Sequence, residues 1–222
     1  MTNGPSTPLR PSHVVYLHGF ASSPDSGKAH RFAAECAARG IGFTCPDLNE
    51  PEFETLTVTR MVAQTRDAIA ASGDGPVALV GSSLGAFVAV HAAAQDLTGR
   101  VAKLVLMAPA FDFGGNRLKQ IGEHGIERWR EEGSLEFFHY GHNRPRQVWF
   151  KLYEDAAQYD AFKLQLSMPI QIFQGRHDDV VLPATVTAWC DGRTNVDLTW
   201  LDDGHQLANS IEAIVRATFP MV

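Results

Sequence analysis

Short apolar runs alternate with longer segments of helical periodicity along most of the chain. The apolar runs are bounded by glycine, proline or polar residues and predict buried strands at 13–17, 42–45, 77–80, 101–107, 170–173 and 196–200. Apolar residues spaced by three or four predict helices at 26–38, 57–71, 84–94, 183–189 and 209–218. Because continuous apolar strands that alternate with helices form parallel sheets covered on both faces, we predict an α/β fold with a six-stranded parallel sheet.

This alternation breaks between residues 110 and 166. The segment contains no run typical of a strand, and it is rich in charges, glycine, proline and aromatic residues. The aromatic residues are Phe111, Phe113, Trp129, Phe137, Phe138, Tyr140, Trp149, Phe150, Tyr153, Tyr159 and Phe162. Long connections inside compact domains are uncommon and often functional. We predict a helical lid inserted over 110–166 whose aromatic side chains line a pocket; an elaborated crossover without that role is the alternative.

The composition agrees with a single globular domain over residues 1–222. Hydrophobic residues make up 45% of the chain and charged residues 20%, which is typical of a protein with a large core. The formal net charge is −6, and lysines and arginines do not cluster in long runs. This charge pattern argues against a nucleic-acid partner, and no apolar run approaches the roughly 18 residues that predict a membrane span.

The cysteines and the amino-terminal segment suggest a location. Cys36, Cys45 and Cys190 are too few and too widely spaced for a disulfide framework, and no Cys-x-x-Cys pair suggests zinc. Residues 1–12 are rich in threonine, proline and serine and lack the apolar stretch of a secretory signal. We expect a flexible amino-terminal tail, free thiols and a cytoplasmic protein, monomer or homodimer, without a metal or other cofactor.

A serine between a predicted strand and a predicted helix is the strongest candidate for chemistry. Gly81-Ser82-Ser83-Leu84-Gly85 matches the pattern Gly-x-Ser-x-Gly, with Ser83 at its centre. At such a sharp turn the serine adopts a strained backbone conformation, and the flanking glycines allow neighbouring elements to approach closely. We predict Ser83 as a nucleophile supported by Gly81 and Gly85; an ordinary glycine-serine turn is the alternative.

A serine hydroxyl needs a positioned base, and the base needs an acid that orients it. His205 follows the last predicted strand directly, at the same edge of the sheet as Ser83. The acid is expected between them along the chain, where Asp178 and Asp179 follow another predicted strand. We predict His205 as the base and Asp178 as the acid. Asp179 is the alternative acid, or else caps the helix that begins near residue 183.

Acyl transfer also requires backbone N–H groups directed at the developing oxyanion. The loop after the first predicted strand contains His18-Gly19-Phe20, in which Gly19 lets the backbone come close to the nucleophile. We predict the N–H groups of Phe20 and Leu84 as the two donors. His18 is expected to support this loop by hydrogen bonding, and a role as a second base is the alternative.

Together these segments resemble the α/β-hydrolase superfamily. Residues 18–20 resemble its oxyanion loop, 81–85 its nucleophile elbow, 175–178 with Val181 and Pro183 its acid loop, and 203–205 its histidine loop. The order of serine, acid and histidine also matches, and the chain is most similar to small bacterial esterases and acyl-protein thioesterase-like members. The resemblance implies a serine hydrolase with an α/β-hydrolase fold. Because only about a dozen residues precede the first strand, we expect a sheet without the two amino-terminal antiparallel strands of larger members.

The expected reaction is two-step acyl transfer from a small-molecule ester or thioester with a small-to-medium acyl group. The aromatic insert favours an apolar acyl or aryl group. Its arginines are candidates for binding a carboxylate or phosphate, namely Arg117, Arg128, Arg130, Arg144 and Arg146. Other chemistry of the superfamily (perhydrolase, lyase or peptidase) and a catalytically silent binding protein are the alternatives.

Overall fold

A computed structural model describes residues 10–114 and 123–219 of the chain. Most of the predicted amino-terminal tail and Arg117 lie outside the described residues. Six strands form one sheet: β1 (His13–Leu17), β2 (Gly42–Thr44), β3 (Val77–Ser82), β4 (Val101–Met107), β7 (Ile170–Gly175) and β8 (Val196–Leu201). They are all parallel, in the order β2-β1-β3-β4-β7-β8, which confirms the predicted six-stranded parallel sheet.

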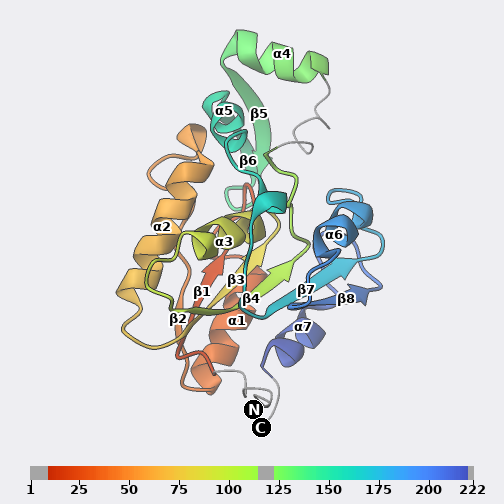
Figure 1. The fold of residues 1–222 in the computed structure, drawn as a ribbon. Coiled ribbons are helices and arrows are strands. Elements are labelled where there is room, and N and C mark those ends of the chain that lie inside the picture. The colour runs from red at the N-terminus through yellow and green to blue at the C-terminus, as the bar shows by residue number, and fades with distance from the viewer. Residues whose placement is uncertain (1–9, 115–122, 220–222) are drawn as a thin grey trace.

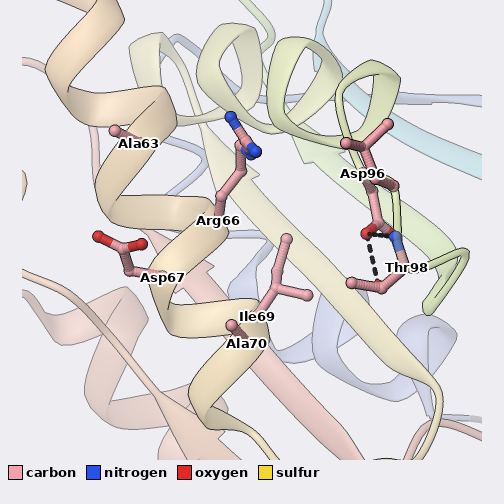
Figure 2. A pocket seen from close by; sticks show the side chains of 8 residues that line it. Ala63, Arg66, Asp67, Ile69, Ala70, Asp96 and Thr98 are labelled. Carbon is pink, nitrogen blue, oxygen red and sulfur yellow. Dashed lines mark hydrogen bonds between the residues drawn. The ribbon is translucent and has the colours of Figure 1, made fainter.

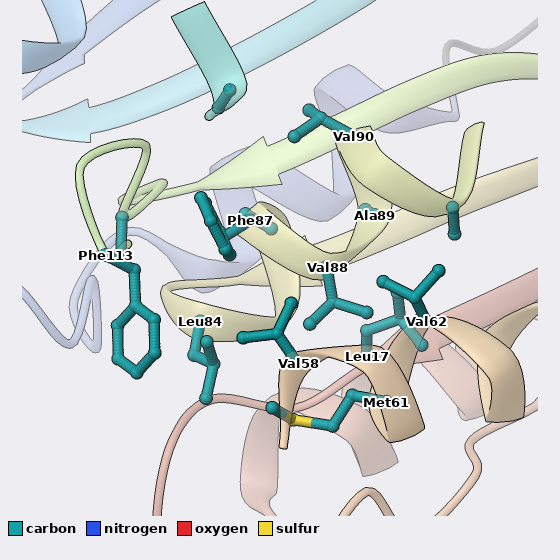
Figure 3. Close-up of a cluster of buried hydrophobic side chains, with 14 of the residues drawn as sticks. Leu17, Val58, Met61, Val62, Leu84, Phe87, Val88, Ala89, Val90 and Phe113 are labelled. Atoms are coloured by element: carbon teal, nitrogen blue, oxygen red, sulfur yellow. The ribbon is translucent and has the colours of Figure 1, made fainter. Parts of the chain in front are cut away.

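Helices cover both faces of this sheet (Figure 1). They are α1 (Gly27–Ala38), α2 (Val58–Ala71), α3 (Leu84–Ala94), α6 (Pro183–Cys190) and α7 (Ile211–Thr218). Helices α1 and α7 pack on one face with the cluster that contains Tyr16 and Phe32, whereas α2, α3 and α6 pack on the other. On that second face, Leu17, Val62 and Val88 lie between α2, α3 and the sheet (Figure 3). Because α3 is buried on all sides, the residue before it is held rigidly.

The inserted segment is not helical throughout, so the prediction of a purely helical lid is wrong. It contains α4 (Glu123–Glu132), an antiparallel hairpin of β5 (Ser134–His139) and β6 (Arg144–Trp149), and α5 (Lys151–Ala156). Two features hide the two-residue period of these strands in the sequence. The Phe137-Phe138 doublet interrupts the alternation of β5, and Pro145, which cannot donate a ladder hydrogen bond, lies within β6.

The insert extends the hydrophobic core on the α2–α3 face of the sheet. The Trp129 side chain is fully buried, and its indole Nε1 donates to Val148 O at 2.8 Å, which ties α4 to the hairpin. Trp129 also packs edge-on against Phe137, Phe150 and Tyr153. The predicted aromatic residues therefore serve first to hold the insert together, and only some of them reach a cleft.

Candidate active site

The predicted site residues lie at the carboxyl edge of the sheet, around the point where the strand order reverses. From β1 the chain goes first to β2 on one side and then to β3 on the other. The loops after β1 and β3 consequently diverge and leave a crevice between them, which is where open α/β sheets bind ligands. Residues 18–20 follow β1 and Ser83 follows β3, so both border this crevice.

Ser83 occupies a sharp turn between β3 and α3. Its φ of 54° and ψ of −114° lie outside the regions that non-glycine residues usually adopt. Hydrogen bonds hold this strained conformation, because Ser83 N–H donates to Met107 O at 2.8 Å and Ser83 O accepts from Ala86 and Phe87 N–H. The side chain is thus fixed at the edge of the sheet, as expected for residues in which local strain serves function.

The two glycines of the turn are required by close backbone packing. A Cβ atom on Gly81 would lie 2.6 Å from backbone atoms of Gly85 and Ala86, and one on Gly85 would lie 2.6 Å from His18 O. Neither backbone can move far without disturbing the sheet. Gly81 and Gly85 therefore let α3 start directly above β3 and beside β1.

His205 connects Ser83 to Asp178. The imidazole Nε2 lies 3.1 Å from Ser83 Oγ, and Nδ1 lies 2.9 Å from Asp178 Oδ2. In the neutral imidazole, Nδ1–H donates to the carboxylate, which leaves Nε2 free to accept the serine proton. This arrangement has the geometry of a nucleophile, a base and an orienting acid.

Asp178 is buried, and neighbouring groups donate hydrogen bonds to both of its carboxylate oxygens. Its oxygens accept hydrogen bonds from His205, from the Gln174 side chain and from the backbone N–H groups of Val180 and Val181. Burial alone would raise the pKa of Asp178, but these hydrogen bonds, that of His205 foremost, lower it below its usual value. The carboxylate therefore stays ionised beside the imidazole. Asp179 is exposed, and it does not cap α6, whose N-cap is Leu182.

The loop that carries His205 is braced by a residue that sequence reasoning missed. Asp203 accepts hydrogen bonds from Gly204 N–H, Asn209 N–H and the Ser210 hydroxyl. Ser210 is the N-cap of α7, but its hydroxyl donates to Asp203 and does not cap the helix. A polar residue two positions before the base was the only sequence signal for this role.

His18 organises the loop after β1. Leu48 N–H donates to His18 Nε2 at 3.0 Å, so this nitrogen is the acceptor and Nδ1–H donates to Gly19 O at 2.9 Å. A Cβ on Gly19 would lie 3.5 Å from Ser83 Cβ, so the loop runs directly beside the serine.

Two backbone N–H groups near Ser83 are available to a ligand. Leu84 is the first residue of α3, where an N–H has no partner within the helix. Across the described part of the chain, no hydrogen bond uses the N–H of Leu84 or that of Phe20. Gly19, which precedes Phe20, approaches Ser83 closely, so the loop after β1 lies next to the turn that Leu84 follows.

A cleft of about 570 Å³ opens in front of Ser83 and His205. Its apolar wall consists of Phe20, Phe137, Phe138, Tyr140 and Val180, three of which come from the inserted hairpin. The hairpin is anchored beside the site, because Phe137 packs edge-on against Phe20 and Gly141 N–H donates to Ala21 O. The prediction that aromatic residues of the insert line a pocket is supported for these residues of the hairpin.

Among the described residues, the arginines of the insert do not line this cleft. Arg146 binds Glu54 through both guanidinium Nε and Nη2, Arg128 pairs with Glu132, and Arg130 lies over the Phe150 ring. Arg144 is exposed. Among the described residues, the cation that lines the cleft is Lys28, which lies in the first turn of α1 and was not recognised from the sequence.

Two other hollows lie at the opposite, amino edge of the sheet. One, of about 270 Å³, is formed by α2 and the turn before β4, where Asp96 accepts hydrogen bonds from Thr98 (Figure 2). The other lies near the starts of β4, β7 and β8. No histidine or cysteine lines either hollow, in contrast to the cleft at Ser83. Within residues 10–114 and 123–219, no group of three or more potential ligands could hold a metal ion.

Comparison with known proteins agrees with this fold. The sequence model of the family described as "Uncharacterised protein family (UPF0227)" matches residues 13–218. Lipase LipV of Mycobacterium tuberculosis is 34% identical over 123 residues, which make up 53% of this chain and 44% of the lipase. The aligned part of the chain thus spans less than half the length of that relative.

Solved structures resemble the chain over nearly its whole length. Mouse alpha/beta hydrolase domain-containing protein 10 superposes with a TM-score of 0.77 at 18% identity, covering 95% of this chain and 89% of that one. Est1E of Butyrivibrio proteoclasticus with bound ferulic acid gives 0.78 at 16% identity, covering 96% and 88%. The chain therefore has an α/β-hydrolase fold. In the described part of the structure, no helix has the length and apolarity to cross a membrane.

Proposed function

We propose that this chain, which belongs to the uncharacterised protein family UPF0227, is a serine hydrolase that cleaves carboxylic esters or thioesters. The observation that carries the proposal is the single imidazole of His205 in contact with both Ser83 Oγ and Asp178. A buried aspartate bonded to an imidazole, which in turn contacts a strained serine beside a cleft, has little structural purpose outside nucleophilic catalysis. The resemblance to a lipase and to an esterase supports the same reaction class.

The proposed reaction has two steps. In the first step, Ser83 Oγ attacks the substrate carbonyl while His205 Nε2 takes the hydroxyl proton, and the resulting imidazolium then protonates the leaving alcohol or thiol. In the second step, His205 takes a proton from water as the water oxygen attacks the acyl carbon, and the imidazolium then returns this proton to Ser83 Oγ as the carboxylic acid leaves. Asp178 keeps the imidazole in the required tautomer and stabilises the imidazolium.

The N–H groups of Phe20 and Leu84 are proposed to stabilise the oxyanion in both steps. They are unused by other described residues, and they belong to the residue after Ser83 and to the residue after Gly19, which lies close to Ser83. Fixed N–H donors are effective because they need no reorganisation when the charge develops. The apolar wall around Phe137 and Phe138 favours an apolar acyl or aryl group of small to medium size.

Active-site labelling tests this proposal. A fluorophosphonate probe should label the folded wild-type protein, and the label should map to Ser83. The Ser83→Ala variant should lose both labelling and hydrolysis of para-nitrophenyl esters, whereas Ser167→Ala, at the amino edge of the sheet, should retain both. Full esterase activity of Ser83→Ala would overturn the proposal. If Ser83 is the nucleophile, a series of para-nitrophenyl esters and acyl thioesters of increasing chain length would separate esterase from thioesterase activity.

A further inference from the structure

Lys28 places a cation in the cleft that the proposed acyl transfer does not use. It lies in the first turn of α1, and its side chain lines the cleft together with Ser83 and His205. Its Nζ donates to Gln206 O at 2.8 Å. The ammonium is therefore held next to the residue that directly follows the proposed base.

The Lys28 ammonium has unused hydrogen-bonding capacity. An ammonium offers three donors, and among the described residues only Gln206 O accepts from Lys28. Asp178 and Asp203 act on Lys28 through their charges, but the structure describes no carboxylate in ion-pair contact with it. Both acids accept hydrogen bonds from donors of their own loops. The positive charge of Lys28 is thus available to a ligand.

Two hydroxyl groups extend this polar part of the cleft. Ser22 and Ser26 line the cleft on the segment that leads into α1, whereas the aromatic wall comes largely from the hairpin. Ser26 Oγ accepts from Ala29 N–H as the cap of α1, so its own hydrogen can still be donated. One ammonium with neighbouring hydroxyl donors suits a singly charged carboxylate.

The position of Lys28 indicates which part of a substrate it meets. The leaving group of an ester departs toward the imidazole that protonates it. Because Lys28 is bonded to the residue that follows His205, it lies on the leaving-group side. We propose that Lys28 binds a carboxylate on the leaving group, so that the natural substrates are esters or thioesters whose alcohol or thiol portion is anionic. This inference rests on the proposed hydrolase function and specifies its substrate class.

The protonation state of Lys28 agrees with this role. Burial lowers the pKa of Lys28 to about 8, while the charges of Asp203 and Asp178 partly oppose that shift. At neutral pH the side chain is therefore still mainly an ammonium. A partly buried ammonium that is not neutralised by a contacting acid gains stability when an anion binds.

A matched set of esters tests the proposal. Para-carboxyphenyl butyrate and para-carbamoylphenyl butyrate share the acyl group and differ mainly in the charge of the leaving group. The mono-para-carbamoylphenyl ester of glutaric acid moves the carboxylate to the acyl side. Wild-type protein should show a kcat/KM about tenfold higher for the carboxyphenyl ester than for either other ester, as expected for one hydrogen bond to a charged group.

Variants then assign this preference to Lys28. Lys28→Met should remove the preference with little change for the neutral ester, and Lys28→Arg should keep part of it. Lys151→Met, an exposed lysine of α5, is the matched control and should behave as wild type. A positioning role through Gln206 alone would instead lower kcat for all three esters equally in Lys28→Met, and that result would overturn the proposal.

The remaining outcomes separate this inference from the proposed function. Equal kcat/KM for the two butyrates in wild-type protein would refute the role of Lys28 and leave the hydrolase standing. Preference for the glutarate ester would refute the leaving-group assignment. If the neutral ester is not hydrolysed and Ser83 is not labelled by the fluorophosphonate, the hydrolase proposal and the inference fall together.

Discussion

The two walls of the cleft are built in different ways. The wall at the sheet edge carries Ser83, His205 and Asp178 on short loops between buried strands and helices, and each side chain is held by neighbours. The other wall is the β5–β6 hairpin, which packs on the sheet wall through aromatic contacts such as Phe137 on Phe20. On the hairpin, Phe138 and Tyr140 are 46% and 69% exposed.

This difference separates chemistry from recognition. Groups that transfer protons must stay within hydrogen-bond distance of one another, and a closely packed sheet edge meets that demand. Groups that contact a substrate's apolar part need area and shape more than exact position. We therefore expect changes in the sheet wall to affect kcat strongly, and changes in the hairpin to affect mainly substrate preference and stability, except at Phe137, whose ring supports Phe20 of the sheet wall.

The largest expected effect comes from the acid. Asp178→Asn should lower kcat for para-nitrophenyl esters by roughly 10³- to 10⁴-fold, because the amide no longer selects the imidazole tautomer that accepts the serine proton. The measurement is steady-state kinetics, with circular dichroism to verify folding. Asp179→Asn is the matched control one residue away on the exposed side of the loop and should retain wild-type kcat. The opposite ranking would make Asp179 the acid.

Removing a hairpin side chain next to the oxyanion loop should have an intermediate effect on kcat. Phe137→Ala removes the ring that packs against Phe20, so the proposed N–H donor loses support. We expect kcat to fall about 10-fold or more, since small misplacements of catalytic groups are costly. Phe138→Ala, whose ring is exposed in the cleft, should mainly raise KM. If both variants change only KM, the hairpin contributes to binding alone and the two walls are functionally separate.

The substrate preference that we assign to Lys28 should change reversibly with pH. The wild-type preference for para-carboxyphenyl butyrate should be present at pH 7 and disappear as the pH rises through about 8, where Lys28 loses its proton. Asp178 stays ionised over this range because its pKa is lowered, and Tyr16 stays neutral because burial raises its pKa. Effects of pH on the acyl-transfer steps that both esters share cancel in the ratio of their kcat/KM values. Lys28→Arg should keep its preference to higher pH; a wild-type ratio that does not change would contradict the role of Lys28.

The same two regions explain how much the sequence could predict. The strands, the sheet and the position of Ser83 on a strand-to-helix turn follow from uninterrupted apolar runs and local glycines, signals that are contained within about ten residues. The hairpin was not predicted because Pro145 and the Phe137-Phe138 doublet hide its alternation. Its buried face also packs on residues outside its own strands, such as Trp129.

The position of Lys28 in the cleft could not be predicted from the sequence for a related reason. Nothing in its local sequence distinguishes it from a solvent-exposed helix residue, because its position in the cleft results from packing of α1 beside the loop after β8. Asp203 is similar, since its partners Asn209 and Ser210 approach only when that loop folds back. Residues whose roles depend on tertiary contacts alone have no sequence pattern to reveal them.

The smallest expected effect is a loss of stability at low pH, caused by one buried histidine in each of the two regions. His91 lies in α3 and His139 at the end of β5, and burial lowers the pKa of each to about 4. In the unfolded chain a histidine has a pKa near 6.5, so the unfolded state binds more protons as the pH falls below that value. Each histidine should therefore lower the free energy of unfolding as the pH falls from 6.5 toward 4, by about 1–2 kcal/mol at pH 5.

Replacing these histidines one at a time should show which part of the molecule loses stability at low pH. His139→Phe should slow hydrogen exchange at pH 5 for hairpin amides such as that of Val148, because the fully buried imidazole no longer favours an open, protonated hairpin. His91→Phe should instead raise the midpoint of global chemical unfolding at pH 5. His30→Asn, an exposed histidine of α1, should change neither quantity. If His139→Phe raises the global midpoint as much as His91→Phe does, the hairpin and the sheet unfold as one unit, and the two walls of the cleft differ in chemistry but not in stability.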